Sequence, residues 1–202
     1  MNESSLELPL PLSEQPILLH ELNHRISNEF ACIIGLVTHA AARSGNEEVK
    51  AALTRISELL HKHVEIHRAL ERPEQDTYVD AAAYLKRLCR SISRSRLDHM
   101  KISMVAAVSP LRLQSDHCWR LGMIVYELIT NAARHAAFTN GCGEIRLELF
   151  RAGSFVECRV LDNGSAPATV QPGRGLKIVC ELAKTLAGAV EHQFGPGARD
   201  QS

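Results

Sequence analysis

A single histidine and a set of amide, carboxylate and glycine residues far downstream could carry chemistry in this chain. His24 lies in the stretch 21–28, Glu-Leu-Asn-His-Arg-Ile-Ser-Asn. The apolar residues around it recur every three or four positions, which predicts one helical face: Leu19, Leu22, Ile26, Phe30, Ile33 and Val37. At about 100° per residue, His24 lies roughly 200° around the helix from Leu22 and is expected to face away from this stripe. An exposed imidazole can act as a nucleophile near neutral pH, so the pattern suggests a histidine that receives a phosphoryl group.

A polar stripe on a later helix is the first of the downstream groups. Glu127, Asn131, Arg134 and His135 recur at three- and four-residue spacing within a predicted helix over 116–137 that is otherwise rich in apolar residues. Burying carboxylate and amide groups is costly unless they bind something, and a hydrated magnesium ion with phosphates would satisfy them. A solvated helix face is the alternative for this stripe taken alone.

Two glycine-containing motifs follow within about 50 residues. In the first, Asp162 ends an apolar strand and Gly164 lets a ligand approach the backbone closely. Such an aspartate can accept a hydrogen bond from the exocyclic amine of adenine, although Asp-Asn-Gly by itself is also an ordinary turn. In the second motif, Gly173 and Gly175 lie at the start of a helix, and the free amides at a helix start can bind phosphate. The order of the three motifs makes a nucleotide site the better interpretation.

The elements that must position the histidine form an amino-terminal hairpin. Residues 1–15 are a flexible lead-in, and helices are expected over 17–43 and 47–71, joined by Ser-Gly-Asn. A lone hairpin leaves apolar surface exposed to solvent, so we expect two copies to pair into a four-helix bundle. The alternative is that the seams pack on the rest of the same chain. His61, His63 and His67 are expected to be ordinary helix residues, because no carboxylate or cysteine cluster accompanies them.

After a polar linker at 72–76, a second domain is expected over 77–202. Periodicity predicts its elements in this order: helix 80–95, strand 102–108, helix 116–137, strands 145–150 and 155–161, helix 175–186 and a last strand at 189–193. The expected fold is α+β, with a helical hairpin at 16–72 followed by an α/β sandwich.

Composition limits the function further. The chain of 202 residues is 45% hydrophobic and carries 23 basic and 23 acidic residues, so it has no basic excess for duplex nucleic acid. Its six scattered cysteines form no CxxC pair, which argues against a zinc site or a disulfide framework. No apolar run reaches the roughly 18 residues needed to cross a bilayer. We therefore expect a cytoplasmic protein with neither nucleic-acid binding nor membrane insertion.

The combined motifs resemble those of a known family. Residues 127–135, Glu-Leu-Ile-Thr-Asn-Ala-Ala-Arg-His, resemble the N box of the GHKL ATPases, 162–164 the first glycine box, and 173–176, Gly-Arg-Gly-Leu, the second. Residues 21–28 are similar to the Glu-x-x-His-Arg-x-Lys-Asn acceptor box. Four motifs in this order are similar to sensor histidine kinases of the HWE-related branch.

The resemblance implies a role for each matching residue. Asn131 would ligate Mg²⁺ at the phosphates of ATP, and Glu127 would polarise the attacking group or accept its proton. Asp162 would recognise adenine, with Gly164, Gly173, Gly175 and Leu176 shaping the site, and Arg134 or His135 could touch phosphate. His24 would take the γ-phosphoryl group and pass it to an aspartate of a response-regulator receiver domain, and a separate sensor protein is expected to supply the signal.

Departures from the family pattern leave alternatives open. Ser27, Tyr126 and Ala166 replace expected residues, and the chain ends where the family continues into a closing strand. A dimeric histidine phosphotransferase with a degenerate ATP-binding domain, which would relay phosphate between response regulators, is therefore the second hypothesis. An anti-sigma-like binding module is a third, but it would not need the hairpin. His20, one turn before His24, is the alternative acceptor.

Overall fold

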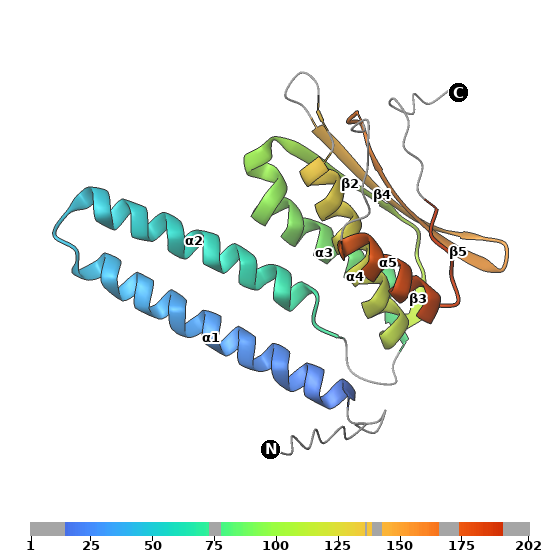
Figure 1. The fold of residues 1–202 in the computed structure, drawn as a ribbon, viewed down its shortest axis with the longest axis horizontal. Helices are drawn as coiled ribbons and strands as arrows, with labels where there is room; N and C mark the ends of the chain where they lie inside the picture. Colours follow the sequence, from blue (N-terminus) through green and yellow to red (C-terminus); the bar gives the residue numbers. More distant parts are fainter. Residues whose placement is uncertain (1–14, 73–77, 136, 139–142, 166–173, 192–202) are drawn as a thin grey trace, which may run out of the picture. The chain divides into compact units, whose positions relative to one another are not determined.

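The chain divides into two compact units, Met1–Leu60 and His61–Ser202, which are described separately. The computed structural model describes residues 15–72, 78–135, 137–138, 143–165 and 174–191, while the side chains of 15–24 and 174 lie outside that description. Figure 1 traces the described helices and strands in sequence order. The predicted α+β fold, a helical hairpin followed by an α/β domain, is confirmed.

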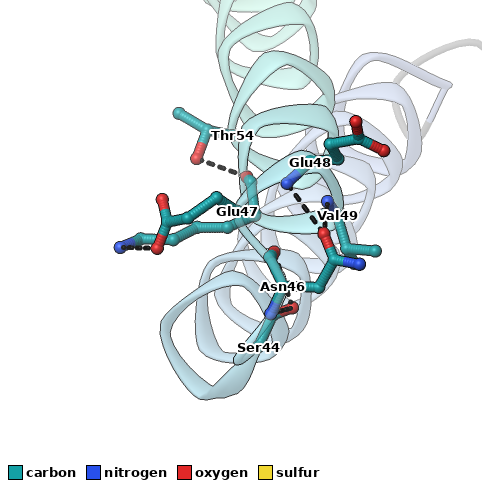
Figure 2. A network of polar contacts seen from close by, with 7 residues as sticks. Ser44, Asn46, Glu47, Glu48, Val49 and Thr54 are labelled. Carbon is teal, nitrogen blue, oxygen red and sulfur yellow. Dashed lines mark hydrogen bonds and ion pairs between the residues drawn. The ribbon is translucent and has the colours of Figure 1, made fainter.

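The first unit contains the predicted hairpin. Helix α1 spans Gln15–Arg43 and helix α2 begins at Glu47 and continues to Ala69. The turn ends because Asn46 caps α2: its Oδ1 accepts the backbone N–H groups of Glu48 at 2.9 Å and Val49 at 3.3 Å (Figure 2). Ser44 holds the cap in place, since its Oγ donates to the carbonyl of Asn46 at 3.2 Å. These bonds satisfy amide groups that a helix start otherwise leaves unpaired.

Each hairpin helix has a stripe of buried or half-buried residues, at the spacing that the sequence pattern predicted. A polar pair links the two helices beside it: the Oγ1 of the exposed Thr38 lies 3.1 Å from the Oγ of the buried Ser57. Five apolar residues remain exposed beside this stripe: Ile33 (46%), Leu36 (66%), Val49 (46%), Ile56 (47%) and Leu59 (49%). Ile33 belongs to the apolar stripe that the sequence predicted for the first helix, so the hairpin alone does not cover the whole of that stripe.

A three-stranded sheet forms one layer of the second unit. Strands β2 (Ile102–Val108), β4 (Gly143–Ala152) and β5 (Phe155–Asp162) lie in the order β2-β4-β5. β4 runs parallel to β2 and antiparallel to β5, which is joined to it by a tight turn with Gly153 at φ +63°. Helices α3 (Ala81–Ile92), α4 (Ser115–His135) and α5 (Arg174–Thr185) form the other layer (Figure 1).

The core of this unit lies between the sheet and the helices. Alternate residues of β4 are fully buried, namely Ile145, Leu147 and Leu149, as the two-residue period of a half-buried strand requires. They belong to one cluster with side chains of α3 and α4. Gly122 lets Tyr84 enter this cluster, because a Cβ at that position would lie 2.6 Å from the tyrosine hydroxyl. The isolated glycine within α4 therefore has a packing role.

Short elements that the sequence did not predict complete the unit. Strands β1 (Tyr78–Asp80) and β3 (Arg112–Gln114) pair antiparallel. Asp80 also caps α3, its Oδ1 accepting the N–H of Ala83 at 3.0 Å. After α3 the chain continues into a π-helical turn at Ser93–Leu97 and a 3₁₀ turn at Asp98–Met100.

The strand predicted at 189–193 is absent from the part that the structure describes, 189–191, while 192–193 lie outside it. Helix α5 instead closes with a Schellman-type cap, in which the N–H of Gly188 donates to the carbonyl of Ala183 at 2.9 Å and Ala187 adopts φ 53°. No helix among the described residues is long and apolar enough to cross a membrane.

The end of α2 is bonded to the start of α4. The indole N–H of Trp119 donates to the carbonyl of Leu70 at 2.9 Å. Asp116 pairs with Arg72 at 3.3 Å and with Arg120 at 2.8 Å, and all three side chains are largely shielded from solvent. Sequence reasoning missed this junction, because each of its residues is an ordinary helix or linker residue when considered alone.

Candidate active site

The candidate phosphoacceptor lies on α1. The backbone of His24 is helical, as predicted, and its side chain lies outside the described residues, as does that of His20. Asn28, one turn further along, is exposed, while Ile26 and Phe30 are half-buried. Residues one turn apart lie on the same helix face. Exposure of the His24 imidazole therefore remains a prediction, consistent with its neighbours.

The predicted polar stripe of α4 divides into two parts. Glu127 and Asn131 are half-buried, and they border the apolar residues by which α4 packs against α5, notably Ile124 and Leu128. Arg134 and His135, by contrast, are exposed in the last turn of the helix. The carboxylate and the amide thus lie where two helices meet, whereas Arg134 and His135 lie at the end of α4.

Gly175 connects the predicted boxes in space. A Cβ on this residue would lie 2.7 Å from Glu127 Oε2 and 3.3 Å from Asn131 Nδ2, distances that an ordinary side chain does not tolerate. The first turn of α5 therefore approaches the polar stripe of α4 closely at Gly175, where a larger residue would displace the Glu127 carboxylate. Residues 48 and 44 positions apart in the sequence form one cluster. Leu176 follows at a half-buried position, whereas Gly173 lies outside the described residues.

The chemistry of this cluster suits a cation together with an anion. Amides at the start of α5 favour a negative group such as phosphate. The nearby Glu127 carboxylate would repel phosphate, unless a divalent cation lies between them. Mg²⁺ prefers oxygen ligands and binds through one or two protein groups together with substrate phosphates. The carboxylate of Glu127 and the amide oxygen of Asn131 fit that requirement.

Asp162 lies at the end of β5 on the face of the sheet that meets the helices. It is paired opposite the fully buried Ile145, and its Oδ1 accepts the N–H of Gly164 at 2.9 Å. Asn163 fixes the turn to β4: its Oδ1 accepts the N–H of Glu144 at 2.7 Å, and its own N–H donates to the Glu144 carbonyl at 3.1 Å. The sequence treated Asn163 as a simple turn residue and missed this role.

A backbone bridge ties this loop to the residues that follow α4. Ala137 and Ser165 exchange two hydrogen bonds, with N···O distances of 3.2 and 3.0 Å. The strand end that carries Asp162 is thus held beside the end of the helix that carries Asn131. The close approach of Gly175 and the Ala137–Ser165 bridge thus each bring another segment of the predicted nucleotide site to α4 or to the residues just after it.

Comparisons with known proteins agree with the sequence motifs. Residues 21–96 match the HisKA_2 family model, described as histidine kinase. The chain is 24% identical over 162 residues to blue-light-activated histidine kinase 2 of Erythrobacter litoralis, covering 78% of this chain and 46% of that protein. It is 27% identical over 191 residues to sensor histidine kinase PdtaS of Mycobacterium tuberculosis, covering 90% and 36%. The chain therefore spans less than half the length of these relatives.

Solved structures support the fold. The histidine kinase domain of a blue-light-activated kinase from Erythrobacter litoralis matches with a TM-score of 0.53 at 21% identity, covering 79% of this chain and 86% of that domain. A bacterial phosphotransferase matches with a TM-score of 0.56 at 12% identity, covering 96% and 97%. At these identities the likeness concerns the fold alone. The HisKA_2 match and the named relatives together support a sensor histidine kinase of the HWE/HisKA_2 type.

Proposed function

We propose that this chain is the core of a two-component histidine kinase, which phosphorylates His24 from ATP and passes the phosphoryl group to an aspartate of a response regulator. The observation that carries the proposal is the contact of Gly175 with Glu127 and Asn131, which assembles the N box and the second glycine box. The relatives matched over most of this chain are kinases, so the phosphotransferase alternative is not favoured.

Each residue of the proposed site has its own role in the reaction. Asn131 and Glu127 would hold Mg²⁺, which neutralises phosphate charge when bound, and Asp162 would accept a hydrogen bond from the adenine amine. An imidazole nitrogen of His24 forms a bond to the γ-phosphorus as the bond to the β,γ-bridging oxygen breaks, and ADP leaves with that electron pair. Glu127 would accept the imidazole proton or orient the ring. Most of the catalysis is positioning and charge neutralisation.

The proposed dimerisation rests on the exposed apolar residues of the hairpin. Leu36 on α1 and Leu59 on α2 are 66% and 49% exposed, and similar residues accompany each along its helix. Apolar rows on both helices of a hairpin are typical of the seam of a four-helix bundle. A second copy of the chain is the proposed partner on this face. Leu36→Glu should shift the molar mass measured by light scattering from dimer to monomer, whereas Thr54→Glu, a change of an exposed polar residue on α2, should leave it unchanged.

A labelling experiment tests the kinase proposal. Purified chain is incubated with γ-labelled ATP and Mg²⁺, and acid-labile label on the protein is measured. Wild type and His20→Ala should become labelled, and His24→Ala should not. Absence of label in wild type, combined with rapid uptake of phosphate from a phosphorylated response regulator, would establish the phosphotransferase instead. The separate sensor protein and the cytoplasmic location expected from the sequence remain part of this proposal.

A further inference from the structure

We infer that the solvent face of α3 and of the π-helical turn after it is a docking surface for an acidic segment of a partner protein. This basic face consists of Lys86, Arg87, Arg90 and Arg94, all of which are exposed. It belongs to no motif of the proposed kinase site, and the inference does not depend on phosphoryl transfer.

The opposite side of α3 explains why this face is free to bind. Five residues of the helix are almost fully buried in the core of the α/β domain: Tyr84, Leu85, Leu88, Cys89 and Ile92. α3 is therefore fixed as a rigid support, and its charged residues can only project toward solvent. Arg87 is further held by the ring of Tyr84, with its guanidinium carbon 5.6 Å from the ring centroid. A preorganised cation loses less side-chain freedom when it binds.

The charge of this segment is strongly one-sided. Residues 81–101 contain six lysines and arginines and one acidic residue, Asp98, in a chain that is neutral as a whole. Asp98 is occupied locally, because its Oδ1 accepts the hydroxyl of Ser93 at 2.8 Å. Lys86, Arg90 and Arg94 form no ion pair with any residue that the structure describes. Their mutual repulsion is thus uncompensated within the described residues, and an acidic partner would relieve it.

The neutrality of the chain argues for a protein partner rather than a polyanion. Proteins that bind duplex nucleic acid usually carry a net basic charge, which this chain lacks. The basic face alone attracts an anionic partner only at short range, because salt screens its charge beyond about 8 Å at physiological ionic strength. Amphipathic helices that bind membranes insert their apolar face into lipid, and that face of α3 is already buried in the domain. Arginine supplies three of the four cations, and it is enriched where proteins contact one another.

The spacing of the cations defines the acidic segment. Lys86 and Arg90 are four residues apart within α3, which corresponds to about 6 Å along the helix axis. Arg94 follows at the same sequence interval in the π-helical turn. An extended strand with acidic residues at alternate positions repeats every ~6.7 Å, because each residue rises about 3.3 Å. Two such acidic residues span nearly the same length as Lys86 and Arg90, and a third continues toward Arg94. The partner segment is therefore an extended peptide of the pattern acid-x-acid-x-acid.

Two fluorescent peptides of equal composition test this inference on the full chain. The first is Gly-Glu-Thr-Glu-Thr-Glu-Gly, and the second, Gly-Glu-Glu-Glu-Thr-Thr-Gly, has contiguous acids. The test variant carries Lys86→Gln, Arg90→Gln and Arg94→Gln. A matched control carries the same loss of charge at Arg43, Arg55 and Arg151, which are also exposed. Fluorescence anisotropy at about 0.15 M salt gives the affinities, and circular dichroism verifies that both variants are folded.

The alternating peptide should bind wild type and the control equally, and the test variant should bind it about tenfold more weakly, as the loss of three exposed charge pairs implies. The contiguous peptide should bind wild type severalfold more weakly. The inference is overturned if neither peptide binds, if both bind wild type equally, or if the two variants lose equal affinity. Tighter binding of wild type to single-stranded DNA or to vesicles of one-third phosphatidylserine would also overturn it.

Discussion

Substituting Gly175 by alanine tests whether the approach of α5 to the polar stripe of α4 creates the nucleotide site. The added Cβ would lie 2.7 Å from Glu127 Oε2, which is several tenths of an ångström closer than real contacts allow. Either the carboxylate moves or the first turn of α5 moves. Overpacking of this kind costs about 1–3 kcal/mol, whereas alanine gains up to about 1 kcal/mol over glycine as a helix former. The net change in the free energy of unfolding should therefore stay within about 2 kcal/mol.

Nucleotide affinity should suffer more than stability. Displacing Glu127 removes an oxygen from the position where it would hold Mg²⁺. A loss of about 1–3 kcal/mol in the free energy of Mg²⁺-ATP binding corresponds to a roughly 5- to 150-fold larger dissociation constant. Calorimetric titration of Mg²⁺-ATP measures this directly. Gly35→Ala is the matched control, because nothing lies within 4 Å of a Cβ at that position and the residue lies within α1. The control should bind nucleotide as wild type does.

A double-mutant cycle identifies the contact responsible. In a Glu127→Ala background the nearest obstacle to the new Cβ is gone, so Gly175→Ala should cost much less affinity there than it does in wild type. Nucleotide affinity that is unchanged in Gly175→Ala would refute the reasoning. An equal loss in both backgrounds would also refute it, because the effect would then arise from the backbone of α5 and not from Glu127.

Three further variants test the packing around the site. Ala187 adopts a left-handed conformation, so Ala187→Gly should raise the free energy of unfolding by about 0.5–1 kcal/mol in urea denaturation, and a decrease would contradict the cap assignment. Trp119→Phe leaves the Leu70 carbonyl without its donor and should cost about 1–2 kcal/mol, whereas unchanged stability would exclude a structural bond. Burial and the nearby Arg96 lower the pKa of His63 below 6.5. As the pH falls, His63 is therefore protonated at a higher pH in the unfolded chain than in the folded protein. The free energy of unfolding should decrease as the pH drops below 6.5, and this decrease should be smaller in His63→Gln.

The spacing of the candidate site residues could be interpreted from sequence because it records local geometry. Glu127 and Asn131 are one helical turn apart in any α-helix, and Asp162 ends a strand whose apolar residues are evident. Their assembly was not predictable from composition or periodicity. The contact of Gly175 with Glu127 depends on how α5 packs on α4, and only the family resemblance linked these segments in advance.

The features that the sequence did not predict in the hairpin and at the end of the chain have different physical causes. A pattern of threes and fours identifies apolar helix positions, but it does not show which of them the hairpin buries, and Ile33 and Leu36 are exposed. β1 and β3 are three residues long, too short for a period of two to register. A strand at 189–193 would exist only if a neighbour supplied hydrogen bonds, and the described residues provide none to 189–191.

The last part of α2 belongs to the α/β unit. This helix runs unbroken from Glu47 to Ala69, whereas the second compact unit already begins at His61. Ala69 lies in the core cluster of that unit, and the Trp119–Leu70 bond fastens the end of α2 to α4. The end of α2 is therefore part of the same core as α4, which carries Glu127 and Asn131. The apolar spacing of the helix predicts its length but not this division, because the division depends on the tertiary contacts that each turn makes.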